Sequence, residues 1–233
     1  FAKVRTPLEY EPFDAFRITG PFAAAYGLLL VLVISFLTVG VFSDEMDSES
    51  RFVYYSTKYG PTRGAAAKIL AVFIIATLLY WSGMLLMSLI SFGGMGTSGA
   101  FAPIQTESPY SMYGINFLER YLLILLSGYV ACLFSAGIAM LLFVRTKSAI
   151  SAMSISFLLF AGLPLLAGND AFESFRMLMP DRLFHVPENI NLPCMYQLGN
   201  IVCSQSALLI ALYSFLLIPT VALSYRGFRK GPM

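Results

Sequence analysis

The sequence has little charge. Asp, Glu, Lys and Arg make up only 12% of its 233 residues, whereas they make up about 25% of an average soluble domain. The mean hydropathy is +0.73, and the charged residues are confined to short blocks between long uncharged stretches. A chain of this composition cannot cover its surface with hydrated groups, which excludes a soluble globular protein. The net charge of +2 and the lack of a dense basic patch with interleaved aromatic residues exclude nucleic-acid binding.

The sequence also lacks the motifs of enzymes. It contains no phosphate-binding loop ending in Gly-Lys-Ser/Thr, no His-Glu-x-x-His motif and no Gly-x-Ser-x-Gly motif. The single histidine, His185, is near Asp181 and Glu188; weak metal binding and an ordinary loop residue both fit, and the second is favoured. None of the 13 carboxylates falls inside a hydrophobic stretch, which argues against an ion-coupled carrier. We therefore expect no catalytic site, no metal site and no cofactor in this chain.

Cysteine is scarce, with three residues in the whole chain. Cys132 lies within a hydrophobic stretch and is expected to be a small packing residue. Cys194 and Cys203 lie in a segment that we place outside the cell, where oxidation favours disulfides. A disulfide between them and two free thiols are both compatible with the sequence.

Five hydrophobic stretches are long enough to cross a bilayer, since roughly 20 helical residues span its hydrocarbon core. The glycine-rich segment 93–96 is predicted to leave the helix, and Pro164 predicts a kink or a helix end. The sequence thus predicts an all-α membrane protein, a polytopic helical bundle that forms a single transmembrane domain over residues 1–233. The five predicted spans are residues 21–43, 69–92, 119–144, 148–167 and 205–225.

The distribution of Lys and Arg predicts the orientation in a cell membrane. For alternating spans, the segment 44–68, the hairpin 145–147 and the C-terminal tail fall on one side, and they hold nine of the 15 basic residues. Basic residues in short loops mark the cytoplasmic side. We therefore expect the segment 44–68 and the C-terminus to be cytoplasmic, and the loop 168–204 to be extracellular. Glu119 and Arg120 are expected at headgroup level.

The cytoplasmic segment 44–68 has the pattern of a short helix over about 46–60. Acidic residues open it and basic residues follow, which complements a helix dipole. Phe52, Tyr55 and Tyr59 fall at spacings of three and four, which gives the helix one aromatic face. Such a face could be a docking surface for another protein, or the helix could lie on lipid headgroups. The pattern alone does not choose between them.

A resemblance bears on this choice. The residues Phe42-Ser43-Asp44-Glu45, then Ser56-Thr57-Lys58-Tyr59-Gly60-Pro61-Thr62-Arg63, and Ala67-Lys68 before the next span resemble the cytoplasmic loop of ABC-2-type transporter permeases of Gram-positive type. The resemblance implies six spans, of which the printed sequence would hold the second to the sixth. It also implies that 46–60 is the coupling helix that docks on an ATPase subunit. The docking residues would be Glu45, Glu49, Phe52, Tyr55, Lys58, Tyr59 and Arg63.

The same resemblance implies the partners and the function. The chain would be a permease subunit without its own catalytic site, paired with a second permease copy or a paralogue. It would export a peptide or bacteriocin, a drug, a lipid or an ion, using ATP and Mg bound by separate ATPase subunits. Pro61 and Glu49-Ser50 depart from the usual family pattern, which leaves the docking geometry open. The alternative function is a non-transporting scaffold or sensor subunit that binds a cytoplasmic partner.

Hydroxyl side chains in two spans are candidates for lining a transport pathway. In the family, the spans equivalent to 21–43 and 148–167 border the space between two permease copies. For each residue the alternative is a hydrogen bond to its own helix backbone four residues back, which is common in membrane helices. The candidates are Ser35, Thr38, Ser148, Ser151 and Ser154.

Overall fold

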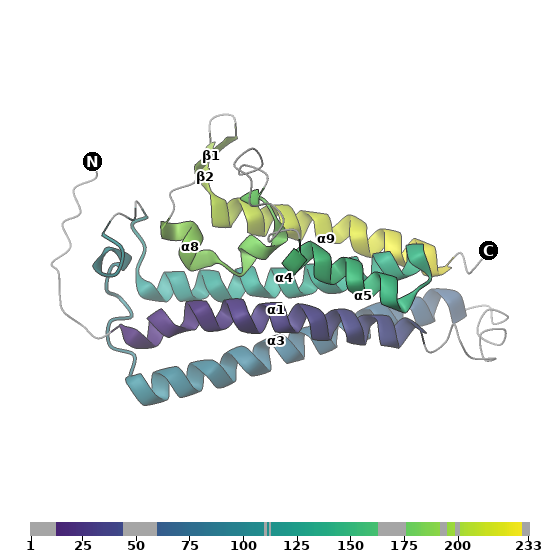
Figure 1. The fold of residues 1–233 in the computed structure, drawn as a ribbon, viewed down its shortest axis with the longest axis horizontal. Helices are drawn as coiled ribbons and strands as arrows, with labels where there is room; N and C mark the ends of the chain where they lie inside the picture. Colours follow the sequence, from purple (N-terminus) through teal and green to yellow (C-terminus); the bar gives the residue numbers. More distant parts are fainter. Residues whose placement is uncertain are drawn as a thin grey trace.

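The protein is a bundle of long helices in the computed structural model, which describes residues 13–43, 60–109, 111, 113–162, 176–191, 195–198 and 201–229. Four helices are long and apolar enough to cross a membrane, which confirms the predicted helical membrane protein in these coarse terms. They run in alternating directions and lie side by side (Figure 1). These helices are α1 (Asp14–Ser43), α3 (Ala65–Met95), α4 (Phe117–Thr146) and α9 (Gln205–Arg229).

The long helices extend beyond the predicted spans. Helix α1 begins before residue 21 and includes Pro21, while α9 continues to Arg229. Helix α3 continues to Met95, so the prediction that the glycine-rich segment leaves the helix at residue 93 was wrong. The helix ends at Met95, because the next residue, Gly96, adopts a positive φ of 83° and its N–H donates to the carbonyl of Phe92 at 3.0 Å. Glycine reaches this conformation without steric cost.

Helix α4 is the central helix of the bundle and packs against α1, α3 and α9. It begins with a capping box, in which the Asn116 side chain accepts from the N–H of Glu119 and the Glu119 carboxylate accepts from the N–H of Asn116. This satisfies two backbone donors that would otherwise be unpaired. One face of α4 is a stripe of small, fully buried residues that lets its neighbours approach closely. The stripe consists of Ser127, Ala131, Ser135 and Ala139.

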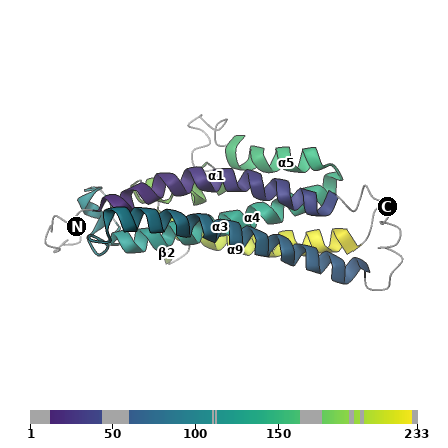
Figure 2. The ribbon, with the colours of Figure 1, turned by 90° about the horizontal axis from the view of Figure 1, so that it is seen from below.

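The fourth predicted span is only partly described. The tight hairpin is confirmed, since Lys147 takes a left-handed conformation and Ser148 caps the next helix. Helix α5 (Ala149–Phe157) and the π-helical turn η3 (Leu158–Gly162) follow. Residues 163–167, including Pro164, lie outside the described residues, so a fifth span stays a prediction. Figure 2 shows α5 against α1, on the side of the bundle away from α3 and α9.

The described part of the predicted outer loop packs onto the bundle. It contains the 3-10 turn η5 (Pro180–Leu183) and the short helix α8 (Val186–Asn191). Phe184 lies across α1 at Gly27, and the Ser127 hydroxyl of α4 donates to the Leu183 carbonyl at 2.7 Å. A two-stranded antiparallel hairpin, β1 (Met195–Leu198) and β2 (Ile201–Ser204), then leads into α9 (Figure 1). The hairpin is a difference from the all-helical prediction.

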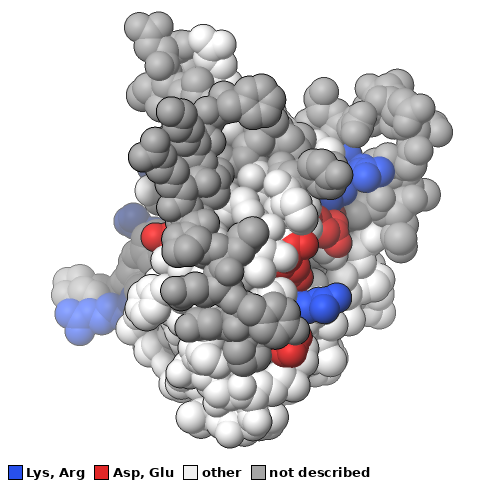
Figure 3. Space-filling view, turned by 90° about the vertical axis from the view of Figure 1, so that its left-hand side faces the viewer, with Lys and Arg blue, Asp and Glu red and all other residues white. Residues whose placement is uncertain are grey.

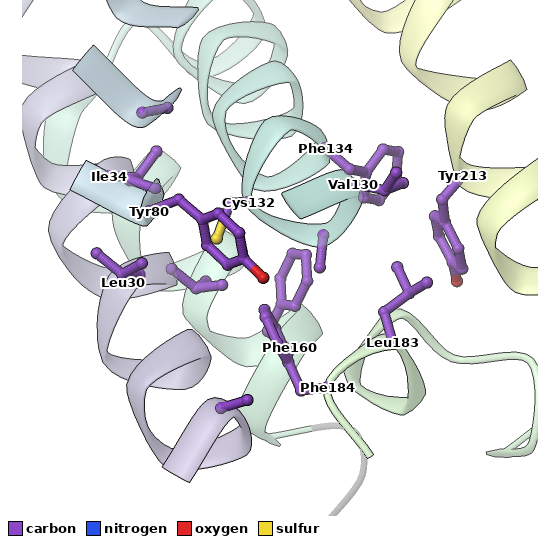
Figure 4. Packing of buried hydrophobic residues seen from close by; sticks show 14 of the residues in the cluster. Leu30, Ile34, Tyr80, Val130, Cys132, Phe134, Phe160, Leu183, Phe184 and Tyr213 are labelled. Atoms are coloured by element: carbon purple, nitrogen blue, oxygen red, sulfur yellow. The ribbon is translucent and has the colours of Figure 1, made fainter. Parts of the chain in front are cut away.

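The core joins all these elements. Figure 4 shows Leu30 and Ile34 from α1, Tyr80 from α3, and Phe160 from η3 gathered around α4, with Phe184 closing the cluster. Cys132 is fully buried at the centre, as expected of a packing residue. The remaining turn of the described fold, η2 (Ile104–Thr106), lies between α3 and α4.

Much of the outer surface is apolar, as a lipid-facing surface must be. Large aliphatic and aromatic side chains on α3 and α9 are exposed along most of the length of these helices. In a soluble protein such extended apolar surfaces are rare. The most exposed of them are Leu78, Leu86, Leu89, Ile90, Phe215 and Ile218.

Candidate functional site

The two ends of the bundle differ in charge. The C-terminal ends of α1, α4 and α9 and the N-terminal end of α3 meet at one end, on the right in Figure 1, as the predicted alternation requires. We call this the basic end, because its charged residues within the described ranges are all Lys or Arg. The five described carboxylates lie toward the opposite end, which Figure 3 shows with both signs of charge mixed. The basic residues of the basic end are Arg63, Lys68, Arg145, Lys147, Arg226 and Arg229.

The predicted docking segment starts and finishes at the basic end. Arg63 is exposed in the π-helical turn η1 (Gly60–Gly64), which leads directly into α3. Such turns occur frequently at functional positions. The other predicted docking residues lie outside the described residues, so the predicted coupling helix 46–60 stays a prediction. These residues are Glu45, Glu49, Phe52, Tyr55, Lys58 and Tyr59.

Lys68 ties together the two helices that flank the docking segment. Its Nζ donates to the carbonyl oxygen of Val41, in the last turn of α1, at 3.2 Å. It also lies 5.5 Å from the centre of the Phe42 ring. The last carbonyls of a helix have no partner within the helix and carry partial negative charge, so a lysine there both completes a hydrogen bond and complements the helix dipole. Lys68 therefore fixes the start of α3 against the end of α1.

Aromatic rings extend this connection to the other helices. Phe42 of α1 stacks on Phe228 of α9, with ring centres 4.2 Å apart, and Phe228 lies 6.5 Å from Phe143 of α4. Stacked aromatic pairs contribute about 0.5–1.5 kcal/mol beyond the area that they bury. We call Phe42, Phe143 and Phe228 the aromatic triplet. A displacement of the α1 end would therefore be passed on to α9 and α4 by direct contact.

The two α1 hydroxyls that were predicted to line a pathway, those of Ser35 and Thr38, are buried and lack hydrogen bonds among the described residues. Ser35 and Thr38 are 2% and 1% exposed, and neither hydroxyl has a hydrogen-bond partner among the described residues. In contrast, Ser88 and Ser224 donate to the carbonyl four residues back in their own helices. The alternative of a local backbone bond therefore does not hold for the two α1 residues. An unpaired buried hydroxyl costs about 1–3 kcal/mol.

The predicted hydroxyls of the 148–167 stretch have different positions. Ser148 caps α5, accepting from the N–H of Ser151 at 3.4 Å and from its hydroxyl at 3.2 Å, and Ser154 is exposed. The sequence prediction missed Ser156, which is fully buried on α5 and has no hydrogen-bond partner among the described residues. The spacing of Ala152 and Ser156 by four residues is the signal that could have identified this buried face.

An ion-pair cluster lies at the end of the bundle opposite the basic end. The Arg120 side chain is 5% exposed and donates to Glu107 at 2.5 Å, and it also contacts the Phe16 carbonyl oxygen at 3.4 Å. Arg17 lies 3.7 Å from the same carboxylate, with its side chain 65% exposed. Glu119 instead caps α4. Glu119 and Arg120, which were expected together at headgroup level, differ in exposure. Glu119 is exposed in the first turn of α4, whereas Arg120 is buried.

The packed outer segment holds a second group of buried polar residues. Asp181 and Arg182 are buried. The Arg182 guanidinium donates to the Glu188 carboxylate at 3.3 Å, and the same carboxylate lies 3.2 Å from His185 Nδ1. Burial raises the pKa of the Asp181 carboxyl, and the nearby Arg182 and His185 partly oppose this. The Asn189 side chain donates to the Arg182 carbonyl at 2.8 Å, which holds the turn together. Among the described ranges, no group of three His, Cys, Asp or Glu side chains could hold a metal ion.

The predicted disulfide concerns one described residue. Cys203 lies in β2 opposite Tyr196 of β1 and is half-buried. Cys194 lies outside the described residues. The two alternatives, a bridge and two free thiols, therefore both stay predictions.

Comparisons with known proteins were made with the whole chain. No family model, no curated protein and no solved structure matches it. The function of the chain is therefore inferred from its residues and their geometry.

Proposed function

We propose that the chain is the membrane subunit of an ATP-driven exporter of the ABC-2 type. In this proposal the segment 44–68 docks on a separate ATPase subunit, which binds ATP and Mg. The permease works as a pair with a second copy or a paralogue and moves its substrate outward. The observation that carries the proposal is the connection of both ends of the docking segment to the bundle, through Lys68 and the aromatic triplet.

The connection gives a mechanical route for energy. Coupling between a nucleotide site and a transport pathway requires an element that contacts both and has two arrangements. A docking segment that is pulled or rotated by an ATPase would move the α1 end, and Phe42 would carry that movement to Phe228 on α9. The route uses direct packing contacts, and it needs no charged group within the membrane.

The charge asymmetry supports the orientation in this proposal. The basic end has six described Lys and Arg residues and no described carboxylate. Basic residues next to membrane spans favour the cytoplasmic side. The docking segment would then face the compartment that contains ATP.

One of the unpaired hydroxyls, that of Ser35, supports a position for the pathway, because Ser35 lines a groove beside α5. Ser35 and Thr38 on α1 and Ser156 on α5 are buried without partners among the described residues. Their cost is tolerated where a second state of the protein, or a substrate, supplies the missing hydrogen bond. Helices α1 and α5 contact each other, and a shallow groove that includes Ser35 and Met153 opens between them. We propose that the second permease copy faces this groove.

The test measures ATP turnover and transport together. The chain is co-purified with the ATPase that it binds, reconstituted in vesicles, and compared with a variant in which Phe52, Tyr55 and Tyr59 are replaced by Ala. We expect the variant to lose ATPase binding and the change in turnover that the permease causes. Unchanged binding and turnover would exclude the docking role. Binding without any nucleotide-dependent transport would favour the scaffold or sensor subunit.

A second variant separates docking from transmission. Phe228→Ala removes the ring between Phe42 and Phe143 and leaves the docking segment intact. We expect it to retain ATPase binding and to reduce transport per ATP hydrolysed. Phe215→Ala is the matched control, because Phe215 is on the same helix and 70% exposed. Equal effects of the two substitutions would exclude the aromatic triplet as the transmission route.

A further inference from the structure

An open apolar groove lies between α3 and α9, with α4 as its floor, and its cavity volume is about 770 Å³. Its walls are large side chains, which include Phe73 and Leu78 from α3, Leu217 and Ile218 from α9, and Tyr129 from α4. Three polar side chains line it, Thr77, Tyr129 and Tyr225, and the first two lie within hydrogen-bond distance of each other. Thr77 Oγ1 donates to the Phe73 carbonyl at 2.7 Å and lies 3.0 Å from the Tyr129 hydroxyl. The groove thus presents a surface that is mostly hydrocarbon, with few polar groups.

The groove leads to the basic end. Arg63 precedes the groove residue Ile74 by 11 positions, and Arg229 follows the groove residue Ile218 by 11 positions. Eleven residues are about three turns of an α-helix, which places Arg229 on the groove side of α9, while Arg63 lies in η1, the turn that leads directly into α3. Both side chains are exposed, and η1, which carries Arg63, packs against α9. The apolar groove therefore opens between two arginines, and no carboxylate within the described ranges lies at this end.

We propose that this groove is a binding site for one anionic phospholipid. Its acyl chains lie between α3 and α9, and its phosphate group is held by Arg63 and Arg229. Flexible chains fill an irregular groove, and basic pockets between membrane helices bind anionic headgroups. A helix of a second copy fits less well, because closely packed membrane helices need small residues at the contact, and Ala222 is the small residue of the groove wall. The site shares Arg63 with the predicted docking residues, but lipid retention is measured without an ATPase, so its test does not depend on the proposed transport function.

The test compares two lipids with the same acyl chains. The purified chain is placed in nanodiscs of equal parts dioleoyl phosphatidylglycerol and dioleoyl phosphatidylcholine, and the lipids retained on release are counted by native mass spectrometry. We expect the wild type to retain phosphatidylglycerol preferentially. The double substitution Arg63→Gln with Arg229→Gln should reduce this preference by about fivefold for each arginine removed.

The matched control removes the same charge from the same end. Arg145 and Lys147 are exposed at the hairpin that leads into α5 and do not line the groove; Figure 2 shows α5 on the side of the bundle away from α3 and α9. Arg145→Gln with Lys147→Gln should leave the preference unchanged. Ala222→Trp, which fills the groove, should lower the retention of both lipids while gel filtration shows an intact protein.

Three results would overturn the proposal. The first is equal retention of the two lipids by the wild type. The second is an equal loss of preference in the control variant, which would mean that general surface charge explains it. The third is efficient disulfide cross-linking between two Ala222→Cys chains in nanodiscs, which would show that a second copy covers the groove.

Discussion

Lys68 donates from Nζ to the carbonyl oxygen of Val41 at 3.2 Å, and so joins the first turn of α3 to the last turn of α1. The two residues are 27 positions apart, and the segment between them contains the predicted docking helix. The bond therefore closes the base of that segment. Lys68 is the one charged residue within α3 (Ala65–Met95).

We predict that Lys68→Met lowers the free energy of unfolding by about 1 kcal/mol, because the Val41 carbonyl loses a charged donor in a half-buried position. The measurement is thermal or denaturant unfolding of the purified protein in detergent. Arg145→Met is the control, since it removes one charge from the same end at an exposed position and should change stability little. Lys68→Arg keeps a donor and should recover most of the loss. Equal stability of all three variants would contradict the role of the bond.

The helices could be predicted from the sequence, and several of their contacts could not. Long uncharged stretches determine membrane helices directly, because the length and the hydropathy are local properties. The burial of Phe184 against Gly27 joins positions far apart in the chain, so no local pattern indicates it. For this reason the sequence predicts the segment 168–204 as an outer loop, whereas its described part packs onto α1 and α4.

A prediction about pH follows from the buried Asp181. Its pKa is raised by burial, so the folded state binds the proton more tightly than the unfolded state. The stability that this proton contributes is present below the unfolded pKa and is lost as pH rises through the folded pKa. Asp181→Asn removes this loss. We expect the variant to be more stable than the wild type at pH 8 and the difference to shrink toward pH 4.

The measurement is the unfolding temperature between pH 4 and pH 8. Both proteins should carry His185→Gln, because His185 is near Asp181 and its charge lowers the Asp181 pKa. A difference that is constant with pH would contradict the assignment. Such a result would indicate a packing effect of the substitution.

The close approach of the outer segment to α1 gives a third prediction. A Cβ atom on Gly27 would lie 2.3 Å from the Phe184 ring. Gly27→Ala should therefore lower the free energy of unfolding by about 1–3 kcal/mol, as overpacking of a core does. Gly40→Ala is the matched control on the same helix, because nothing lies within 4 Å of a Cβ there. It should be neutral or stabilising by up to about 1 kcal/mol.

A double substitution tests whether Phe184 is the cause. Adding Phe184→Leu makes room beside residue 27, so Gly27→Ala should cost less in that background than in the wild type. The difference between the two costs is the coupling energy of the pair. A cost that does not depend on the residue at 184 would mean that the helix backbone, and not the outer segment, limits the space at Gly27.

The hydroxyl positions show where sequence reasoning reaches its limit within a helix. Ser148, Ser151 and Ser154 follow a spacing of three, which turns steadily away from any one face of an α-helix. In the structure the first caps α5 and the last is exposed, while Ser156 takes the buried position. The buried face of α5 can be assigned only once the start of this helix, after the hairpin 145–147, is known. Ser35 and Thr38 are buried on α1, and their role in lining a pathway stays a prediction.

The two arginines on Glu107 give the fourth prediction, since they differ mainly in burial. Arg120 is 5% exposed and bonds Glu107 at 2.5 Å, whereas Arg17 is 65% exposed at 3.7 Å. Arg120→Met should lower the free energy of unfolding by about 3 kcal/mol, because it leaves a partly buried carboxylate without its main partner. Arg17→Met should change it by less than about 1 kcal/mol, since exposed ion pairs are screened by water.

Unfolding at low and high salt checks the cause of the difference. The effect of Arg120→Met should persist at high salt, because a buried pair is screened little, while any effect of Arg17→Met should disappear. Glu107→Gln should resemble Arg120→Met, because it leaves the Arg120 guanidinium buried without its charged partner. If the two arginine variants were equally stable, the Arg120–Glu107 pair would not be what holds the loop between α3 and α4 to the start of α4.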